Sequence, residues 1–411
     1  MECGTGGIKE RETMRLEHKK KTRKIVGVCV ITLLLMSGCS QKNMKTSQQT
    51  YMETWLEKAN LGATETKEEL YEAAQSEDTL VIYTVTTRVF DVKESFEREY
   101  PGLTVEIKHV RSKDVVDQVK LNYEQEKYPC DLVICSDNDG SLNDQLVKPG
   151  IIYPYIPNDI APKMKEGHAD GELFFLGEAL MLFYNGELYK EAPIKNIWEL
   201  TQNKYKGKII MANPLRSFST YGFCSMLLKE EKQVEEAYER YKGEKLRIPE
   251  GSTASEILWE QMAPNIVFTN SSDEVAEGIG NSGKEGMELG IMISSKMRLM
   301  DIGYQFAPIY RLDPFSAVYT PNCIMIAGGC KNINAAKLFV RYILGEADGT
   351  GEGRLPYSTK GTWSTRVDAP DGNDVPLYKM DVMSLDERYI HENREDIQRF
   401  FERILNDNIT E

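Results

Sequence analysis

The 411-residue sequence has few of the side chains on which hydrolytic enzymes depend. It contains four histidines, and only His109, His168 and His391 lie beyond the first 38 residues. A Ser–His–acid triad needs one of them beside a nucleophile. The stretch Gly280–Gly283 (GNSG) lacks the spacing of the GxSxG nucleophile elbow. A secreted hydrolase is therefore the weakest alternative, although paired carboxylates of the glycosidase type are not excluded by residue counts.

Cysteine is also used sparingly. Of eight cysteines, Cys3 and Cys29 lie in the leader and Cys39 has a separate role, which leaves an odd number and no CxxC pair. Such a set predicts neither a zinc site nor a disulfide framework. The five remaining cysteines are Cys130, Cys135, Cys224, Cys323 and Cys330. Most of them lie in apolar runs and are expected to be small buried hydrophobic residues.

Positive charge is in deficit, since the formal net charge is −14. This balance argues against nucleic acid as a partner, because binding a phosphate backbone needs a basic face. An anionic small ligand is still possible in a cleft whose local charge opposes the overall field. No internal repeat of 20–50 residues is present, which excludes a solenoid. The length favours two lobes, and a hydrophobic content of 41% is enough to build their cores.

The longest apolar run near the N-terminus is too short to span a membrane. Ile25–Met36 follows a basic cluster at Lys19–Lys24 and has twelve residues, whereas about 20 are needed to cross a bilayer. It is typical of a signal peptide. Leu35–Cys39 (LMSGC) resembles a bacterial lipobox, which implies that Cys39 is lipidated and becomes the first mature residue. Either Met1 or Met14 is the start.

The stretch Thr79–Val110 organises the rest of the chain. Leu80–Thr84 is an apolar strand, and a helical pattern begins at Val89 and ends at Pro101-Gly102. The alternation from Leu103 then indicates a second strand, so the unit is βαβ and belongs to a parallel sheet. Ligands bind at the carboxyl ends of such strands. The turn there predicts three ligand contacts: Thr86, Thr87 and Arg88.

Polar residues follow three later strands in the same way. Ser136 and Asp137 follow the predicted strand Cys130–Cys135, and we predict both as ligand contacts. Asp137 and Asp139 resemble the start of a calcium-binding loop, but the Glu that closes such a loop is missing, so a calcium site is disfavoured. Leu289–Ile293 ends in Ser295 and Lys296, which are also expected at the ligand.

A Ser/Thr-rich segment follows the predicted strand Ile209–Met211. Ser217, Ser219 and Thr220 open the next helix, and such an arrangement directs N–H groups and hydroxyls at one point. That suits an oxyanion. Simple N-capping without a ligand is the alternative.

Several segments in this order resemble bacterial extracellular solute-binding proteins of ABC importers, in the branch of ferric-ion, phosphonate and sugar-phosphate binders. They include LVIYTVTTRVFDVKESFEREYPGLTVEIKHV, CDLVICSD, ALMLFYNGELY, IWELTQNKYKGKIIMANP and INAAKLFVRYILGE. The resemblance implies an α/β, type II periplasmic-binding-protein-like fold, with two lobes of mixed, mostly parallel sheets joined by hinge strands. It also implies a monomer that needs no cofactor and delivers its solute to a membrane permease driven by an ATPase.

The resemblance further suggests a division of the chain. Residues 1–38 are the lipoprotein signal peptide and 39–76 a flexible tether with one exposed helix at Ser47–Ala59. Lobe 1 takes residues 77–182 and returns at 305–346. Lobe 2 takes residues 183–304, and the helical segment 347–411 packs on it. The protein would lie at the extracellular face of the cytoplasmic membrane.

The family also narrows the ligand. Its metal-binding members carry adjacent tyrosines where this chain has Ser294-Ser295-Lys296, and a His where it has Thr86-Thr87-Arg88. Without phenolates for a hard trivalent cation, a ferric ion is disfavoured and remains an alternative. A phosphate ester, phosphonate, sulfonate or carboxylate is favoured. The family implies anion contacts at Ser217–Thr220 and one at Tyr319 from the first lobe. A lipoprotein that presents its ligand to a sensor kinase would have the same fold.

Overall fold

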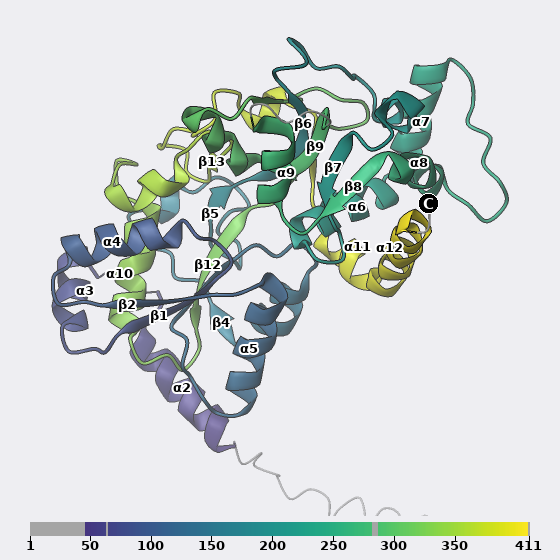
Figure 1. The fold of residues 1–411 in the computed structure, drawn as a ribbon. Coiled ribbons are helices and arrows are strands. Elements are labelled where there is room, and N and C mark those ends of the chain that lie inside the picture. The colour runs from purple at the N-terminus through teal and green to yellow at the C-terminus, as the bar shows by residue number, and fades with distance from the viewer. Residues whose placement is uncertain (1–45, 63–64, 282–286, 410–411) are drawn as a thin grey trace, which may run out of the picture. The chain divides into compact units, whose positions relative to one another are not determined.

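The computed structural model describes residues 46–62, 65–281 and 287–409. The chain divides into two compact units, residues 1–51 and 52–411, and the second unit holds two α/β lobes. Each lobe contains a sheet of seven strands flanked by helices (Figure 1). The predicted two-lobed α/β architecture with mixed sheets is therefore confirmed.

The sheet of lobe 1 has the strand order β13-β5-β12-β3-β1-β2, with β4 beside β12. Its centre is the predicted βαβ unit, in which β1 lies parallel to β2 on one side and to β3 on the other. Strand β12 returns antiparallel between β3 and β5. The strands are β1 (Leu80–Thr84), β2 (Val105–His109), β3 (Leu132–Cys135), β4 (Ile152–Tyr153), β5 (Phe174–Gly177), β12 (Asn322–Ala327) and β13 (Trp363–Ser364).

The sheet of lobe 2 repeats this plan with the order β14-β11-β6-β9-β7-β8, and β10 pairs with β6. Strand β7 is the parallel centre between β8 and β9. The predicted predominance of parallel strands is wrong, because among the described strands antiparallel pairings outnumber parallel ones, seven to five. The strands are β6 (Ala179–Asn185), β7 (Ile209–Ala212), β8 (Ile266–Thr269), β9 (Leu289–Ile293), β10 (Phe306–Pro308), β11 (Ala317–Tyr319) and β14 (Val382–Ser384).

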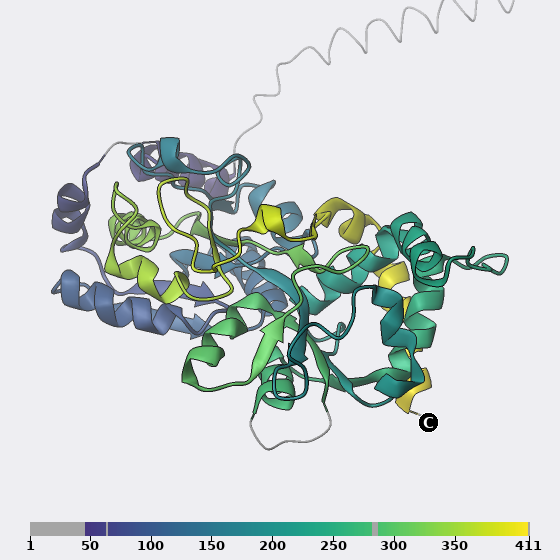
Figure 2. The same cartoon turned by 90° about the horizontal axis from the view of Figure 1, so that it is seen from above.

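The chain crosses between the sheets at points that the sequence did not reveal. It passes from β5 to β6 through Glu178 and returns from β11 to β12 through Thr320-Pro321. The predicted boundaries at residues 182 and 304 therefore differ from the structure, because β6, β10 and β11 all pair within lobe 2. The segment after β13 crosses a third time, toward the yellow C-terminal helices of lobe 2 (Figure 2).

The predicted tether, residues 39–76, also differs from the structure over its described part. From Met52 onward, helix α2 (Ser47–Ala59) is partly buried against lobe 1, where Trp55 Nε1 donates to the carbonyl of Cys330 over 2.8 Å. Lys337, which is almost fully buried, forms an ion pair of 2.9 Å with Glu65. Apolar residues on one face of each helix supply the burial that a free tether would not have.

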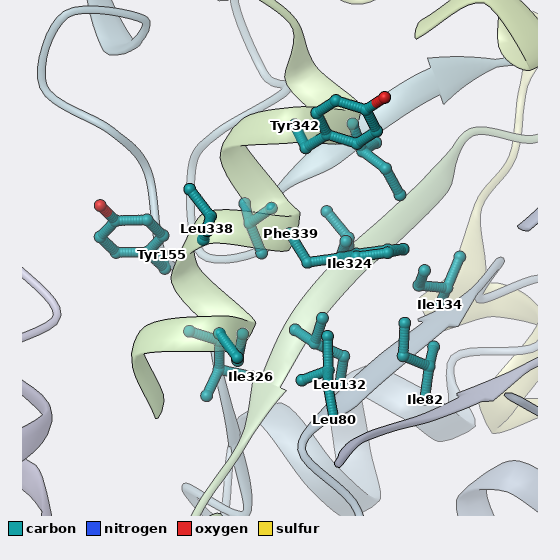
Figure 3. Close-up of a cluster of buried hydrophobic side chains, with 14 of the residues drawn as sticks. Leu80, Ile82, Leu132, Ile134, Tyr155, Ile324, Ile326, Leu338, Phe339 and Tyr342 are labelled. Carbon is teal, nitrogen blue, oxygen red and sulfur yellow. The ribbon is translucent and has the colours of Figure 1, made fainter. Parts of the chain in front are cut away.

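Helices cover both faces of the sheets. In lobe 1, α4 and α10 cover one face, where Phe339 and Tyr342 pack on Ile324 and neighbouring strand residues (Figure 3), and α5 covers the other. In lobe 2, α12 adds Ile397, Phe401 and Ile404 to the core. The described cysteines are buried thiols, as predicted.

The helix bounds complete the description. They are α2 (Ser47–Ala59), α3 (Lys67–Ala74), α4 (Val89–Glu99), α5 (Ser112–Glu124), α6 (Phe218–Lys229), α7 (Glu231–Lys242), α8 (Ala254–Met262), α9 (Ser272–Gly280), α10 (Ile333–Leu344), α11 (Glu387–Glu392) and α12 (Arg394–Ile409). Two 3₁₀ helices matter below, η6 (Ser294–Ile302) and η7 (Glu352–Tyr357).

Helix α4 offers a matched test of core packing. Phe96 is fully buried, with ring centroids 5.0 Å from both Tyr100 and Phe339, whereas Phe90 is 44% exposed. We expect Phe96→Ala to lower the free energy of unfolding by about 3–5 kcal/mol, through lost burial and an unfilled cavity. Phe90→Ala should cost much less. Urea denaturation of both variants checks this, and equal losses would contradict the assigned core face.

Candidate ligand-binding cleft

A cavity of about 930 Å³ lies between the two lobes. The loops that line it follow the carboxyl ends of six strands: β1, β2 and β3 of lobe 1, and β7, β8 and β9 of lobe 2. In each lobe these strands form one parallel trio, so their ends meet at the same edge of the sheet. The volume falls in the range of ligand pockets, about 300–1,000 Å³.

Eight of the eleven predicted contacts line this cavity. The first four come from lobe 1 and the others from lobe 2: Thr86, Thr87, Arg88, Ser136, Ser217, Ser219, Ser295 and Lys296. The structure thus brings together turns separated by up to two hundred residues of chain.

Three predicted contacts are absent from the lining, and two of them are Thr220 and Tyr319. Thr220 is fully buried, and its hydroxyl donates to Ser217 Oγ over 2.9 Å, so it supports a lining residue instead. Tyr319 lies on β11 in lobe 2, not in the first lobe as the family resemblance implied. Its hydroxyl is 3.0 Å from His168 Nε2.

Asp137 is the third predicted contact outside the lining. It is 4% exposed, and its carboxylate accepts the backbone N–H groups of Leu142 and Asn143 over 3.2 and 2.8 Å. Burial raises its pKa to about 7, and the negative charges of Asp139 and Glu172 add to the effect. The residue holds the turn after β3 together, a role that a sequence pattern of alternating acids does not reveal.

Arg88 reaches the cavity, but its charge is already balanced. One nitrogen of its guanidinium lies 2.5 Å from Glu178, and the group stacks on the ring of Tyr357 with a separation of 5.0 Å. The other oxygen of Glu178 accepts the amide of Asn322 over 2.6 Å. Both Glu178 and Asn322 line the cavity at the lobe crossings. Sequence reasoning missed both, since each lies beside an apolar strand.

Further cationic residues contribute to the lining. Arg298 donates to the carbonyl of Ser295 over 2.8 Å, and burial together with the nearby Arg88 lowers the pKa of Arg298. Lys296 is hydrogen-bonded to Asp273, and its pKa is lowered by burial. Among the described residues, six cationic side chains and five carboxylates line the cavity, whereas the whole chain has a net charge of −14. The cations not predicted are Arg111, Arg216, Arg298 and Arg394.

Three helices begin at the cavity without a side-chain cap. The residues at their N-caps are Arg88 for α4, Arg111 for α5 and Ser217 for α6, and none makes a capping hydrogen bond. By contrast, α3 and α8 have complete capping boxes. In α4 the N–H groups of Phe90 and Asp91 already donate to the carbonyls of Thr87 and Arg88. All three helix starts nevertheless place the positive end of a helix dipole at the cavity, where it favours an anion.

A comparison of the sequence with known protein families agrees with this geometry. The model of the family of bacterial extracellular solute-binding proteins matches residues 85–348. The chain belongs to this family. A solute-binding protein captures a small molecule and does not transform it, so this one is a binding component for transport and not an enzyme.

Solved structures show the same fold at low sequence identity. The apo ferric ion-binding protein A of Pasteurella haemolytica is 14% identical, with a TM-score of 0.60 over 81% of this chain and 99% of its own. The periplasmic binding protein AfuA of Actinobacillus pleuropneumoniae, solved with fructose-6-phosphate bound, is 18% identical, with a TM-score of 0.57 over 80% and 98%. The substrate-binding protein of an ABC transporter from Agrobacterium tumefaciens is 12% identical, with a TM-score of 0.62 over 82% and 96%.

Two further findings complete the comparison. A search of curated protein sequences gave no match. Within residues 46–62, 65–281 and 287–409, no helix of this solute-binding protein has both the length and the apolar character needed to cross a bilayer.

The raised pKa of Asp137 predicts a dependence of stability on pH. Between about pH 4, where an unfolded Asp loses its proton, and the folded pKa of about 7, the folded protein holds a proton that the unfolded chain has released. This contribution to stability is therefore lost as the pH rises through that window. We expect Asp137→Asn to lose less unfolding free energy than the wild type between pH 5 and pH 8. Denaturation at both values measures it, and identical losses would contradict the burial of an ionisable group here.

Proposed function

We propose that this solute-binding protein captures a small organic oxyanion for an ABC importer. The ligand class is a phosphate ester, phosphonate, sulfonate or carboxylate. The observation that carries the proposal is a cleft with nearly balanced charge and three helix starts, set in a chain with an acidic surplus. Charge-assisted hydrogen bonds to cationic donors contribute about 1.5–3 kcal/mol each. Three or four of them suffice for micromolar binding, about 8 kcal/mol.

Contacts from both lobes support a closing mechanism. Ser136 approaches the cavity from lobe 1, while Ser219 and Lys296 approach it from lobe 2. A ligand that contacts both lobes stabilises the closed arrangement, and one that contacts a single lobe does not shift the equilibrium. The chain segments at Glu178 and Thr320 are the natural hinges, because hinge motion is absorbed by a few residues at the ends of elements.

A ferric ion is the competing ligand, because one of the similar structures is a ferric ion-binding protein. The chemistry of the lining argues against it. Tyr221 is the one tyrosine among the described residues of the lining, and its hydroxyl donates to the carbonyl of Arg394 over 3.2 Å. Burial raises its pKa to about 12, which opposes the phenolate that a hard trivalent cation prefers. The sugar phosphate bound to AfuA supports the oxyanion reading.

The test is a thermal-shift screen followed by titration calorimetry. The panel contains sugar phosphates, phosphonates, sulfonates, dicarboxylates and ferric salts. We expect a rise in melting temperature with one oxyanion class and an affinity that falls with added salt, since charge carries the binding. A rise with ferric salts alone would overturn the proposal.

The same screen yields a variant test. Lys296→Gln removes a buried cation from the cleft, whereas Lys232→Gln removes one whose side chain is 86% exposed on α7. We expect Lys296→Gln to weaken binding of the active oxyanion by about tenfold or more, and Lys232→Gln to leave it unchanged. Equal affinities of the two variants would remove Lys296 from the site.

We also propose that the protein is a lipid-anchored monomer at the extracellular face of the cytoplasmic membrane. The supporting residues are the signal-peptide pattern and Cys39, which lie outside the described residues. Cys39→Ala should move the protein from the membrane fraction to the medium or the periplasm, because a thioether-linked lipid can no longer form. Fractionation with immunoblotting measures this, and continued membrane association of the variant would contradict the anchor at Cys39.

A further inference from the structure

The first two lobe crossings form a buried polar floor under the cavity. Glu178 connects β5 to β6, while Thr320 and Asn322 lie where β11 gives way to β12. Their exposures are 6%, 1% and 6%, and all three line the cavity. Arg88, which is 9% exposed, completes the floor from the start of α4.

Two atoms of this floor have no partner among the described residues. They are Arg88 Nη1 and Thr320 Oγ1, and both are buried. An unsatisfied buried polar group costs about 1–3 kcal/mol, so native proteins rarely leave one without a role. Both residues line the cavity, but these two atoms are shielded from solvent, so a ligand reaches them only when the side chains turn toward it.

Glu178 sets the polarity of the group that can sit beside it. Its two oxygens already accept from Arg88 and Asn322. A carboxylate offers about four acceptor positions and no donor, so two positions remain. A fully ionised oxygen placed there would face a negative charge in a poorly solvated site, while a hydroxyl or ammonium group would find an acceptor.

We propose that this floor is a subsite that selects solutes with a hydrogen-bond donor on or next to their oxyanion. Glu178 accepts the donor, and Arg88 Nη1 and Thr320 Oγ1 bind oxyanion oxygens once their side chains turn toward the ligand. The donor is a proton on a phosphoryl or phosphonyl oxygen, or a neighbouring hydroxyl or amino group. A sulfonate without a neighbouring donor is rejected, since a site built for a hydrogen bond strongly discriminates against a ligand that lacks it. The inference rests on the proposed oxyanion function.

Four small probes separate the two sources of the donor. They are ethylphosphonate, ethanesulfonate and the hydroxyethyl derivative of each, titrated below the second pKa of the phosphonates. We expect the wild type to bind ethanesulfonate most weakly, by about tenfold or more. Tight binding of ethylphosphonate identifies the acid proton as the donor. Tight binding of only the two hydroxyethyl compounds identifies the neighbouring hydroxyl.

Two variants that each convert a cleft carboxylate to an amide provide the control. Glu178→Gln changes the floor, and Asp273→Asn changes the exposed partner of Lys296. We expect Glu178→Gln to close the gap between ethanesulfonate and the other probes, because an amide can donate to the sulfonate. Asp273→Asn should strengthen binding of all four probes and keep the gap. Thermal melts without ligand establish that both variants are folded.

The outcomes separate this inference from the function on which it rests. Equal binding of all four probes to the wild type, or an unchanged gap in Glu178→Gln, would overturn the donor subsite while leaving oxyanion binding intact. No detectable binding of any probe at millimolar concentration would instead count against the oxyanion function itself, and the subsite would fall with it.

Discussion

The convergence of strand ends is the constraint on which the rest of the structure depends. In each lobe a parallel trio, β2-β1-β3 or β8-β7-β9, delivers three loops to one edge of the sheet. Parallel strands must be joined by crossover helices, and those helices begin where the strands have just ended. The helix starts at Arg88, Arg111 and Ser217 therefore reach the cavity through topology alone. The cationic side chains add to a positive field that the backbone already supplies.

The electrostatics of the cleft and of the surface serve different ends. The surplus of acidic residues favours solubility of the chain, and it does not oppose contact with an uncharged partner. Inside the cleft, low solvation makes each remaining charge count for more. Burial lowers the pKa of Lys296 and of Arg298, which means that both would gain from an anion at close range. A cleft that is balanced but poorly solvated can bind strongly without a large net charge.

The predictable part of the site is the part that follows local rules. The structure places Ser217 and Lys296 in the lining. Ser217 was predicted because a Ser/Thr-rich segment opens a helix after a strand, and Lys296 because polar residues directly after an apolar strand mark its carboxyl end. The lobe crossings were not predictable, since β5, Glu178 and β6 lie in one nearly continuous apolar stretch. The change of sheet is visible only in the pairings of β6 with β9, β10 and β11. Asp137 lies outside the lining for a different reason: an acid in a turn can accept backbone N–H groups as readily as it can contact a ligand.

The buried pair of Arg88 and Glu178 is difficult to explain by stability. Moving two charges from water into a protein interior costs several kcal/mol for each ion, and well-packed apolar residues often replace such pairs without loss. Here the pair is incomplete as well, because Arg88 Nη1 has no partner among the described residues. The position of the pair suggests a functional role, because the pair connects the first turn of α4 to the point where the chain leaves lobe 1. A charge pair kept at a hinge, with one donor left unpaired beneath the cavity lining, is costly as a structural support but well suited to bind a ligand whose arrival is coupled to closure.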